Sequence, residues 1–149
     1  MKVLIVEPGR VPYESTIKDD LKAEQEIVGG LIEPVYMEDG AIIICNEEGL
    51  LEPLPFNRLI THDSGEWRQH QIDDESTGIF GTFFVCCDGE ENFTSLSLEL
   101  MEKYKKKFAE AQKLFEVRPH KYSVVKYPAT RVPINQRLGS PVTKDVPER

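Results

Sequence analysis

The sequence predicts a single α+β domain in which a small antiparallel or mixed sheet of four to five strands packs against a short helix and one long C-terminal helix. Short β-branched apolar runs alternate with turn residues, as is typical of strands. Two other stretches carry apolar residues at the helical spacings of three and four. The 149 residues are 40% hydrophobic and 30% charged, which suits one domain with a sizeable core.

The first elements follow from residue type. Residues 2–8 are β-branched and end at a proline, so they are predicted to form a buried strand. Residues 9–16 are predicted to be a turn or an irregular edge. Residues 17–28 have a helical pattern, and Gly29 with the glycine after it is expected to end that helix.

The next segment is predicted to be a strand followed by a hairpin. Residues 31–37 read as a strand, and Pro34 places it at an edge or a bulge. Residues 41–45 are apolar throughout, which predicts a central strand, and residues 46–49 supply a turn with glycine. Residues 50–56 are expected to return beside 41–45 and to leave the sheet early, since their prolines cannot donate ladder hydrogen bonds.

The central third is predicted to be a loop, a strand and the long helix. Residues 60–78 are polar and read as a surface loop, and residues 79–88 as one strand. A helix is expected over residues 98–116, with Ser97 as its N-cap and Phe108 buried on its apolar face. That face comprises Met101, Tyr104, Phe108, Ala111 and Phe115. The opposite side is read as a solvated face made of Lys103, Lys105, Lys106 and Lys107.

Charge divides the chain into two parts. Residues 1–117 carry a net charge of −13 and are predicted to be the domain, whereas residues 118–149 carry +5 and form a basic, proline-rich extension. Within this extension residues 121–127 suit one more strand. The arm after Pro128 is expected to be poorly packed unless a partner chain receives it, and a homodimer through this extension is the partner arrangement considered.

Composition excludes several classes of protein. No apolar run reaches the roughly 20 residues that span a bilayer, and the N-terminal run meets a glutamate and a proline at once, so we expect a cytoplasmic protein. The acidic body argues against nucleic acid as a partner, because binding there requires neutralised phosphates, and the basic extension alone could attract one. The odd cysteine count argues against a disulfide framework and for buried thiols at Cys45, Cys86 and Cys87.

Six stretches, taken in order, resemble a known family: "EIVGGLIEPVY", "CNEEG", "LPFNR", "GTFFV", "FTSLS" and "YKKKF". They are similar to proteins from phages, plasmids and Firmicutes genomes that share the domain of unknown function 3846. The resemblance covers about residues 1–108. It implies a compact α+β domain carried by mobile elements, and it brings no established reaction and no catalytic residues.

Metal and catalytic patterns are weak. His62, Asp63 and His70 are the one metal-like cluster, but they stand in a polar loop, and a metal site needs three or more converging ligands. Cys86 and Cys87 are neighbours on a predicted strand and should point to opposite faces, so they cannot act as a pair. We therefore predict no catalytic residue, no metal site and no cofactor.

The candidate ligand-binding residues are Asn57, Arg58 and Thr82. Each interrupts or ends an apolar run, and an amide, a guanidinium and a hydroxyl beside backbone N–H groups can hold a phosphate or a carboxylate. Arg58 is expected at a solvated rim. In the alternative interpretation Arg58 pairs with a carboxylate of the protein and Asn57 caps the hairpin.

The leading hypothesis is a non-enzymatic binding protein of phage or mobile-element origin with a counter-defence role. It would sequester a small nucleotide-like signal in the host cytoplasm or mask a host defence protein. The alternative is an acidic protein-interaction or DNA-mimic inhibitor. A third hypothesis is a metal-dependent hydrolase that uses the loop containing His62 and Asp63.

Overall fold

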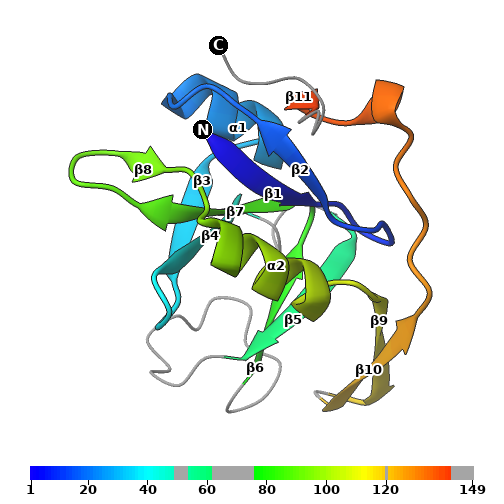
Figure 1. Ribbon diagram of the computed structural model, residues 1–149. Helices are drawn as coiled ribbons and strands as arrows, with labels where there is room; N and C mark the ends of the chain where they lie inside the picture. The colour runs from blue at the N-terminus through cyan, green and yellow to red at the C-terminus, as the bar shows by residue number, and fades with distance from the viewer. Residues whose placement is uncertain (49–53, 62–75, 120, 142–149) are drawn as a thin grey trace.

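The computed structural model describes residues 1–48, 54–61, 76–119 and 121–141, which form a mixed α+β structure (Figure 1). No helix among these residues is long and apolar enough to cross a membrane. The elements in chain order are β1 (Lys2–Val6), β2 (Tyr13–Thr16), α1 (Leu21–Val28), β3 (Ile32–Tyr36), β4 (Ala41–Asn46), β5 (Phe56–Thr61), β6 (Ser76–Phe80), β7 (Phe83–Asp88), β8 (Phe93–Thr94), α2 (Leu98–Lys107), β9 (Ala111–Arg118), β10 (Lys121–Tyr127), the 3-10 turn η1 (Ile134–Gln136) and β11 (Ser140–Pro141).

The main sheet is antiparallel and larger than the sequence predicts. Among the described residues it has seven strands in the order β11-β2-β1-β7-β4-β3, with β8 paired to β7. Two further antiparallel pairs, β5–β6 and β9–β10, stand outside it. The α+β class is confirmed, while the expected four to five strands are too few. Pro34 lies on β3, which is an edge strand as predicted.

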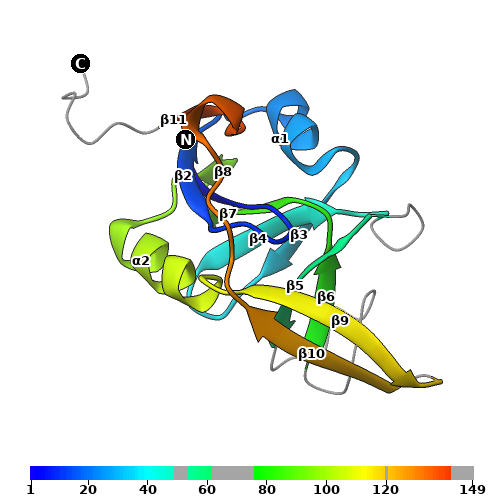
Figure 2. The same ribbon diagram turned by 90° about the vertical axis from the view of Figure 1, so that its right-hand side faces the viewer.

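Helices cover both faces of the main sheet, α1 on one and α2 on the other (Figures 1 and 2). Because side chains alternate along a strand, Leu4 and Val6 of β1 pack with α2, while Val3 and Ile5 pack with α1. The apolar run of β4 is continuous for the same reason, since both of its faces are buried. Cys86 and Cys87 likewise face opposite layers, as predicted.

Helix α1 ends at the glycine predicted to stop it, but it begins at Leu21 and not at residue 17, where the sequence predicts its start. Its N-cap is Asp20, whose carboxylate accepts a hydrogen bond from the Ala23 backbone N–H at 2.8 Å. Gly29 ends it in the left-handed region with φ of 77°, and its N–H donates to the Gln25 carbonyl. Ser97 caps α2 in the same way as Asp20 caps α1, which confirms its predicted role.

The predicted hairpin over residues 41–56 is wrong. Strand β4 pairs with β3 and β7, and β5 pairs with β6 in a separate sheet, while residues 49–53 lie outside the described residues. The single strand expected over residues 79–88 is also divided, into β6 and β7. Gly81 turns the chain between them with φ of 82°, and a Cβ there would lie 2.9 Å from Leu54 Cδ1.

The long helix predicted over residues 98–116 is wrong in its second half. Helix α2 ends at Lys107, and Ala111 and Phe115 belong to strand β9. The Phe108 carbonyl, which would accept from residue 112 in a continued helix, accepts from the Arg58 guanidinium instead. Phe108 itself is 1% exposed, so its predicted burial is confirmed.

The C-terminal arm, residues 128–141, returns to the body of the molecule (Figure 2). Thr130 forms a bridge with Arg10, and its carbonyl accepts from the Val11 N–H at 2.9 Å. Val132 is buried in the core under α1, and β11 pairs with β2. The expectation that this arm packs poorly is therefore wrong for residues 128–141. Strand β10 confirms the strand predicted over 121–127, and its partner β9 crosses the predicted boundary at residue 117.

We expect Phe108→Ala to lower the free energy of unfolding by about 3–5 kcal/mol, because it removes a core ring. This ring meets the Phe83 ring edge-on at a centroid distance of 5.3 Å. Urea denaturation measures the change. Leu98→Ala is the control on the same helix, since Leu98 is 83% exposed and its loss should cost less than about 0.5 kcal/mol. Equal effects of the two substitutions would contradict the packing.

We expect Gly139→Ala to release the C-terminal arm. The residue has φ of +70°, and a Cβ there would lie 2.4 Å from Ser15 Oγ and 3.0 Å from the Thr16 carbonyl oxygen. Gly40→Ala is the matched control, because its φ is +92° but nothing lies within 4 Å. Both variants carry the roughly 1–2 kcal/mol of left-handed strain, but only Gly139→Ala adds a clash. Trypsin should cleave after Arg137 faster in the Gly139→Ala protein than in the parent, whereas Gly40→Ala should leave the cleavage rate unchanged. Equal cleavage rates in the two variants would argue against the docked arm.

Candidate anion-binding groove

Arg58 is the largest fully buried side chain among the described residues, with an exposed fraction of 0%. Its Nε and Nη2 atoms donate to the Phe108 carbonyl at 3.3 and 3.0 Å, and Nη2 also donates to the Arg10 carbonyl at 2.8 Å. Its Nη1 atom donates to the Asn57 carbonyl and to Asn57 Oδ1, at 3.3 and 2.8 Å. A guanidinium has five N–H groups, so these five bonds leave no donor for a ligand.

Burial lowers the pKa of Arg58 to about 10, so the side chain remains protonated at neutral pH. Its acceptors are backbone carbonyls and one amide, and no carboxylate among the described residues pairs with it. The expected position at a solvated rim is wrong. The carboxylate pairing of the alternative interpretation is not what holds Arg58 either.

Asn57 is also fully buried and is engaged on both sides of its amide. Its Nδ2 donates to the carbonyls of Val6 and Gly81 at 2.8 and 2.9 Å, while Oδ1 accepts from Arg58. Thr82 is half-buried and follows Gly81 in the link between β6 and β7. The structure thus brings Asn57 and Arg58 together, but within the fold instead of at a surface, and it shows no bond from Thr82 to either.

Cations gather in a different place, in a groove of about 340 Å³ between β2, α2 and the C-terminal arm. We call it the basic groove. It is lined by Val11, Pro12, Tyr13, Glu14, Lys105, Arg131, Val132 and Arg137. None of these cations is a predicted site residue, because Lys105 is expected on a solvated helix face and the two arginines in an unpacked arm. The one sequence signal for them is the positive charge of the extension beside an acidic domain.

The cations of the basic groove differ in their partners. Lys105 Nζ forms ion pairs with Glu14 at 2.5 Å and with Glu102 at 3.5 Å. Burial acts to lower the pKa of Lys105, but the hydrogen bond and charge of Glu14 outweigh it and raise that pKa. Arg131 is exposed, and neither it nor Arg137 forms an ion pair with any carboxylate of the described residues. The groove therefore holds two guanidinium groups that no carboxylate of the described residues compensates.

Tyr13 and Val132 fix the position of Arg137. The guanidinium carbon lies 5.2 Å from the centroid of the Tyr13 ring, and Nε donates to the Val132 carbonyl at 3.0 Å. The Tyr13 hydroxyl donates to Glu7 at 2.6 Å and accepts from the Leu138 N–H at 3.0 Å. Arg137 is thus held in place, while the N–H groups of Nη1 and Nη2 form no hydrogen bond with any described residue.

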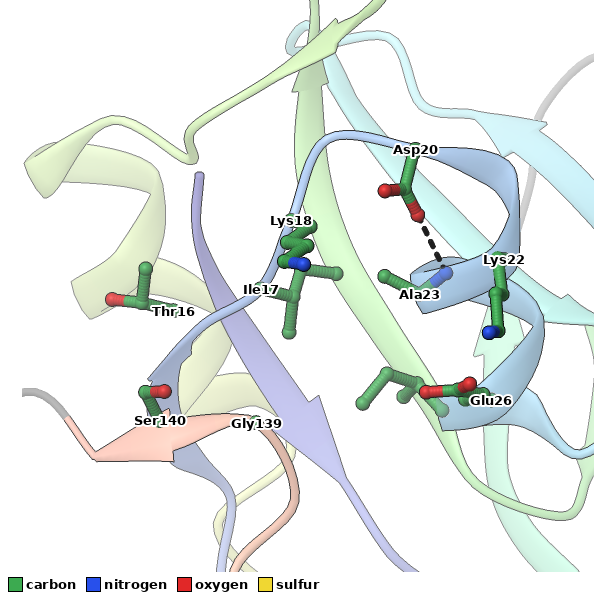
Figure 3. Close-up of a pocket in the computed structure, with 10 residues that line it drawn as sticks. Thr16, Ile17, Lys18, Asp20, Lys22, Ala23, Glu26, Gly139 and Ser140 are labelled. Atoms are coloured by element: carbon green, nitrogen blue, oxygen red, sulfur yellow. Dashed lines mark hydrogen bonds between the residues drawn. The ribbon is translucent and has the colours of Figure 1, made fainter.

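A second hollow of about 330 Å³ lies between α1 and β11 (Figure 3). It contains two lysines, Lys18 and Lys22, and two carboxylates, Asp20 and Glu26, so its lining has no net charge. Asp20 also serves as the N-cap of α1, as its bond to Ala23 in Figure 3 shows. Of these two hollows, the basic groove is therefore the better site for an anion.

Groups suited to catalysis are poorly placed in the described residues. Burial raises the pKa of the Cys45 and Cys86 thiols, which disfavours the reactive thiolate. No group of three His, Cys, Asp or Glu side chains among the described residues is arranged to hold a metal ion. His62, Asp63 and His70 lie outside the described residues, so the structure does not test that cluster.

Comparison with known proteins gives one match. The family described as Domain of unknown function (DUF3846) matches residues 1–109. No curated protein and no solved structure matches the chain. The matched segment contains Tyr13, Glu14 and Lys105, whereas Arg131 and Arg137 come from the segment beyond it.

We expect Arg58→Ala to destabilise the fold by about 3 kcal/mol or more, because it leaves the Phe108 and Arg10 carbonyls buried without a donor and opens a cavity. Arg58→Lys keeps the charge but has fewer donors, so it should recover only part of the loss. Urea denaturation measures both. Arg118→Ala removes an equal charge from an exposed position and should be nearly neutral. An Arg58→Ala protein as stable as the parent would show that the guanidinium is dispensable to folding.

Proposed function

We propose, from the premise that the chain belongs to the family described as Domain of unknown function (DUF3846), that the protein is a non-enzymatic binding protein which captures a small nucleotide-like ligand. The ligand's phosphate would lie in the basic groove, between Arg131 and Arg137. The observation that supports this is the presence of two guanidinium groups without ion-pair partners among the described residues, on a chain whose net charge is −8.

A phosphate suits these two arginines because a guanidinium presents paired N–H donors that match two phosphate oxygens. The groove volume of about 340 Å³ lies in the lower part of the range usual for small-molecule sites, which is about 300–1,000 Å³. Positive charge inside a groove of an otherwise acidic protein also attracts an entering anion, because the groove focuses the local electrostatic field. Val11, Pro12 and Val132 supply apolar surface beside the charges.

The groove is largely formed before a ligand arrives. The bridge between Thr130 and Arg10 and the buried Val132 side chain hold the arm on either side of Arg131. Arg137 is held by the Tyr13 ring and the Val132 carbonyl. Such preorganisation reduces the entropy that binding costs, so a small anion can be held by few contacts.

The groove's own side chains support capture more than turnover. Glu14 is the one carboxylate among the described residues that line it, and it is bound to Lys105, so it is a poor general base. In a host cytoplasm a protein of this kind would act by lowering the free concentration of a nucleotide-like signal, which is the counter-defence role we propose for a family carried by mobile elements. The homodimer through the C-terminal extension stays a prediction.

Native mass spectrometry of the freshly purified full chain tests the proposal and separates its rivals. We expect an adduct whose mass and fragments identify a phosphate-bearing small molecule. A stoichiometric metal ion would instead favour the hydrolase, which would act through the loop containing His62 and Asp63. A co-purified host protein without a small molecule would favour the interaction or DNA-mimic role.

We expect the double substitution Arg131→Gln with Arg137→Gln to weaken phosphate binding by at least about tenfold, since charged hydrogen bonds contribute about 1.5–3 kcal/mol. Isothermal titration calorimetry with adenosine monophosphate and with a cyclic dinucleotide measures the affinity. Arg118→Gln is the control, because it removes an exposed arginine on β9 outside the groove. Binding by the parent should weaken as salt rises. Equal affinities for the double variant and the parent would exclude the basic groove as the site.

A further inference from the structure

A second charged pocket, of about 430 Å³, lies where the start of α1 meets β3 and the turn between β7 and β8. We call it the acidic pocket. It borders α1, and α1 and α2 cover opposite faces of the sheet (Figure 1). Five carboxylates line it: Asp19, Asp20, Glu24, Asp88 and Glu91. No lysine or arginine among the described residues lines it, so the charge of the pocket is strongly negative.

Glu24 distinguishes this pocket from an ordinary solvated acidic surface. Its side chain lines the pocket yet is only 5% exposed, and its Oε2 atom has no hydrogen-bond partner among the described residues. Burial, and then the charges of Asp19 and Asp20, raise the pKa of Glu24. A buried carboxylate oxygen without a donor is costly, which makes a cationic hydrogen-bond donor its natural complement.

Apart from the amide of Asn92, the rest of the lining is aromatic and apolar. Tyr36, on the edge strand β3, is 64% exposed, and Phe93 of β8 is half-buried. Leu21 and Ile32 complete the lining from α1 and β3. Exposed aromatic rings beside carboxylates suit a cation that is flat and weakly hydrated, because such a group can stack on a ring and donate hydrogen bonds at its edge.

The spacing of the carboxylates argues for an extended cation instead of a single metal ion. No three acidic side chains among the described residues converge closely enough to hold a metal ion. Asp20 is already engaged as the N-cap of α1, so Asp19, Glu24, Asp88 and Glu91 are the available acceptors. A guanidinium carries five donors in one plane and can reach acceptors that lie apart, which a compact ammonium does less well.

We propose that the acidic pocket binds a guanidinium group, with Glu24 as its principal acceptor and Tyr36 and Phe93 as its aromatic walls. The group comes either from a small guanidinium compound or from an arginine side chain of a partner. This site is separate from the basic groove and takes a ligand of opposite charge, so it does not depend on the proposed phosphate binding.

The probe that tests the site is N-acetyl-arginine methylamide, which carries a guanidinium but no free amine or carboxylate. Titrated into the ¹⁵N-labelled full chain, it should shift the backbone amide signals of residues 19–24, 32, 36, 88 and 91–93. N-acetyl-norleucine methylamide, its uncharged counterpart, should leave them unchanged. Shifts elsewhere only, no shifts at millimolar probe, or equal shifts with norleucine would overturn the proposal.

Substitutions then identify the acceptor. Glu24→Gln keeps the shape but removes the charge, and we expect it to weaken binding of the arginine probe at least about tenfold. Asp88→Asn, at an exposed position at the end of β7, should weaken binding as well. Glu26→Gln is the matched control on α1, because Glu26 is exposed and lines the other hollow. The proposal fails if Asp88→Asn and a folded Glu24→Gln protein both bind like the parent, or if Glu26→Gln weakens binding equally.

Two further probes distinguish the source of the guanidinium. Agmatine represents a free small molecule, and the peptide N-acetyl-Gly-Arg-Gly-amide represents an arginine side chain on a partner. Tighter binding of agmatine assigns the pocket to a small guanidinium compound, whereas tighter binding of the peptide assigns it to a protein partner. If neither binds at millimolar concentration, the proposal is wrong.

Discussion

The buried guanidinium of Arg58 is the constraint on which the rest of this structure depends. Taking a cation out of water is costly, and here no carboxylate of the described residues offsets the cost. Five hydrogen bonds to carbonyl and amide oxygens offset it instead. These oxygens come from the loop after β1, from β5 and from the end of α2, so three segments distant in sequence must converge on one side chain. A missing acceptor would leave a buried donor unsatisfied, which makes the arrangement highly specific.

This convergence accounts for local features that local sequence does not explain. Helix α2 ends because the carbonyl of Phe108 faces Arg58, and the chain that follows becomes strand β9. The Leu59 N–H is then satisfied by the Gln112 side chain at 2.9 Å, which ties β5 to β9. Arg10 extends the connection outward, since its carbonyl accepts from Arg58 while its own Nη1 donates to Thr130 Oγ1 at 3.1 Å. The arm that supplies the arginines of the basic groove is thus linked, through Arg10, to the buried network.

Opposite charges occupy separate places on the molecule. The basic groove borders β2 and the acidic pocket borders β3, which lie toward opposite ends of the strand order. Two arginines of the groove come from the segment beyond residues 1–109, whereas every residue that lines the acidic pocket lies within it. Under the two proposals, the acidic pocket would be a property of the family domain, and anion capture would depend on the extension of this chain.

The sequence by itself determined the α+β class, the family, the positions of β1, β3, β4 and β10, the end of α1, the start of α2 and the burial of Phe108. These follow from local rules, namely residue type, apolar periodicity and capping, which act over a few residues. Only the tertiary structure decided that β4 does not pair with β5, that Gly81 divides β6 from β7 and that the C-terminal arm docks on β2. It also decided the role of Arg58. The local sequence around an arginine that ends an apolar run is the same whether its N–H groups face solvent or donate to backbone carbonyls. Strand pairing and hydrogen-bond satisfaction depend on contacts between residues tens of positions apart, and no short pattern records them.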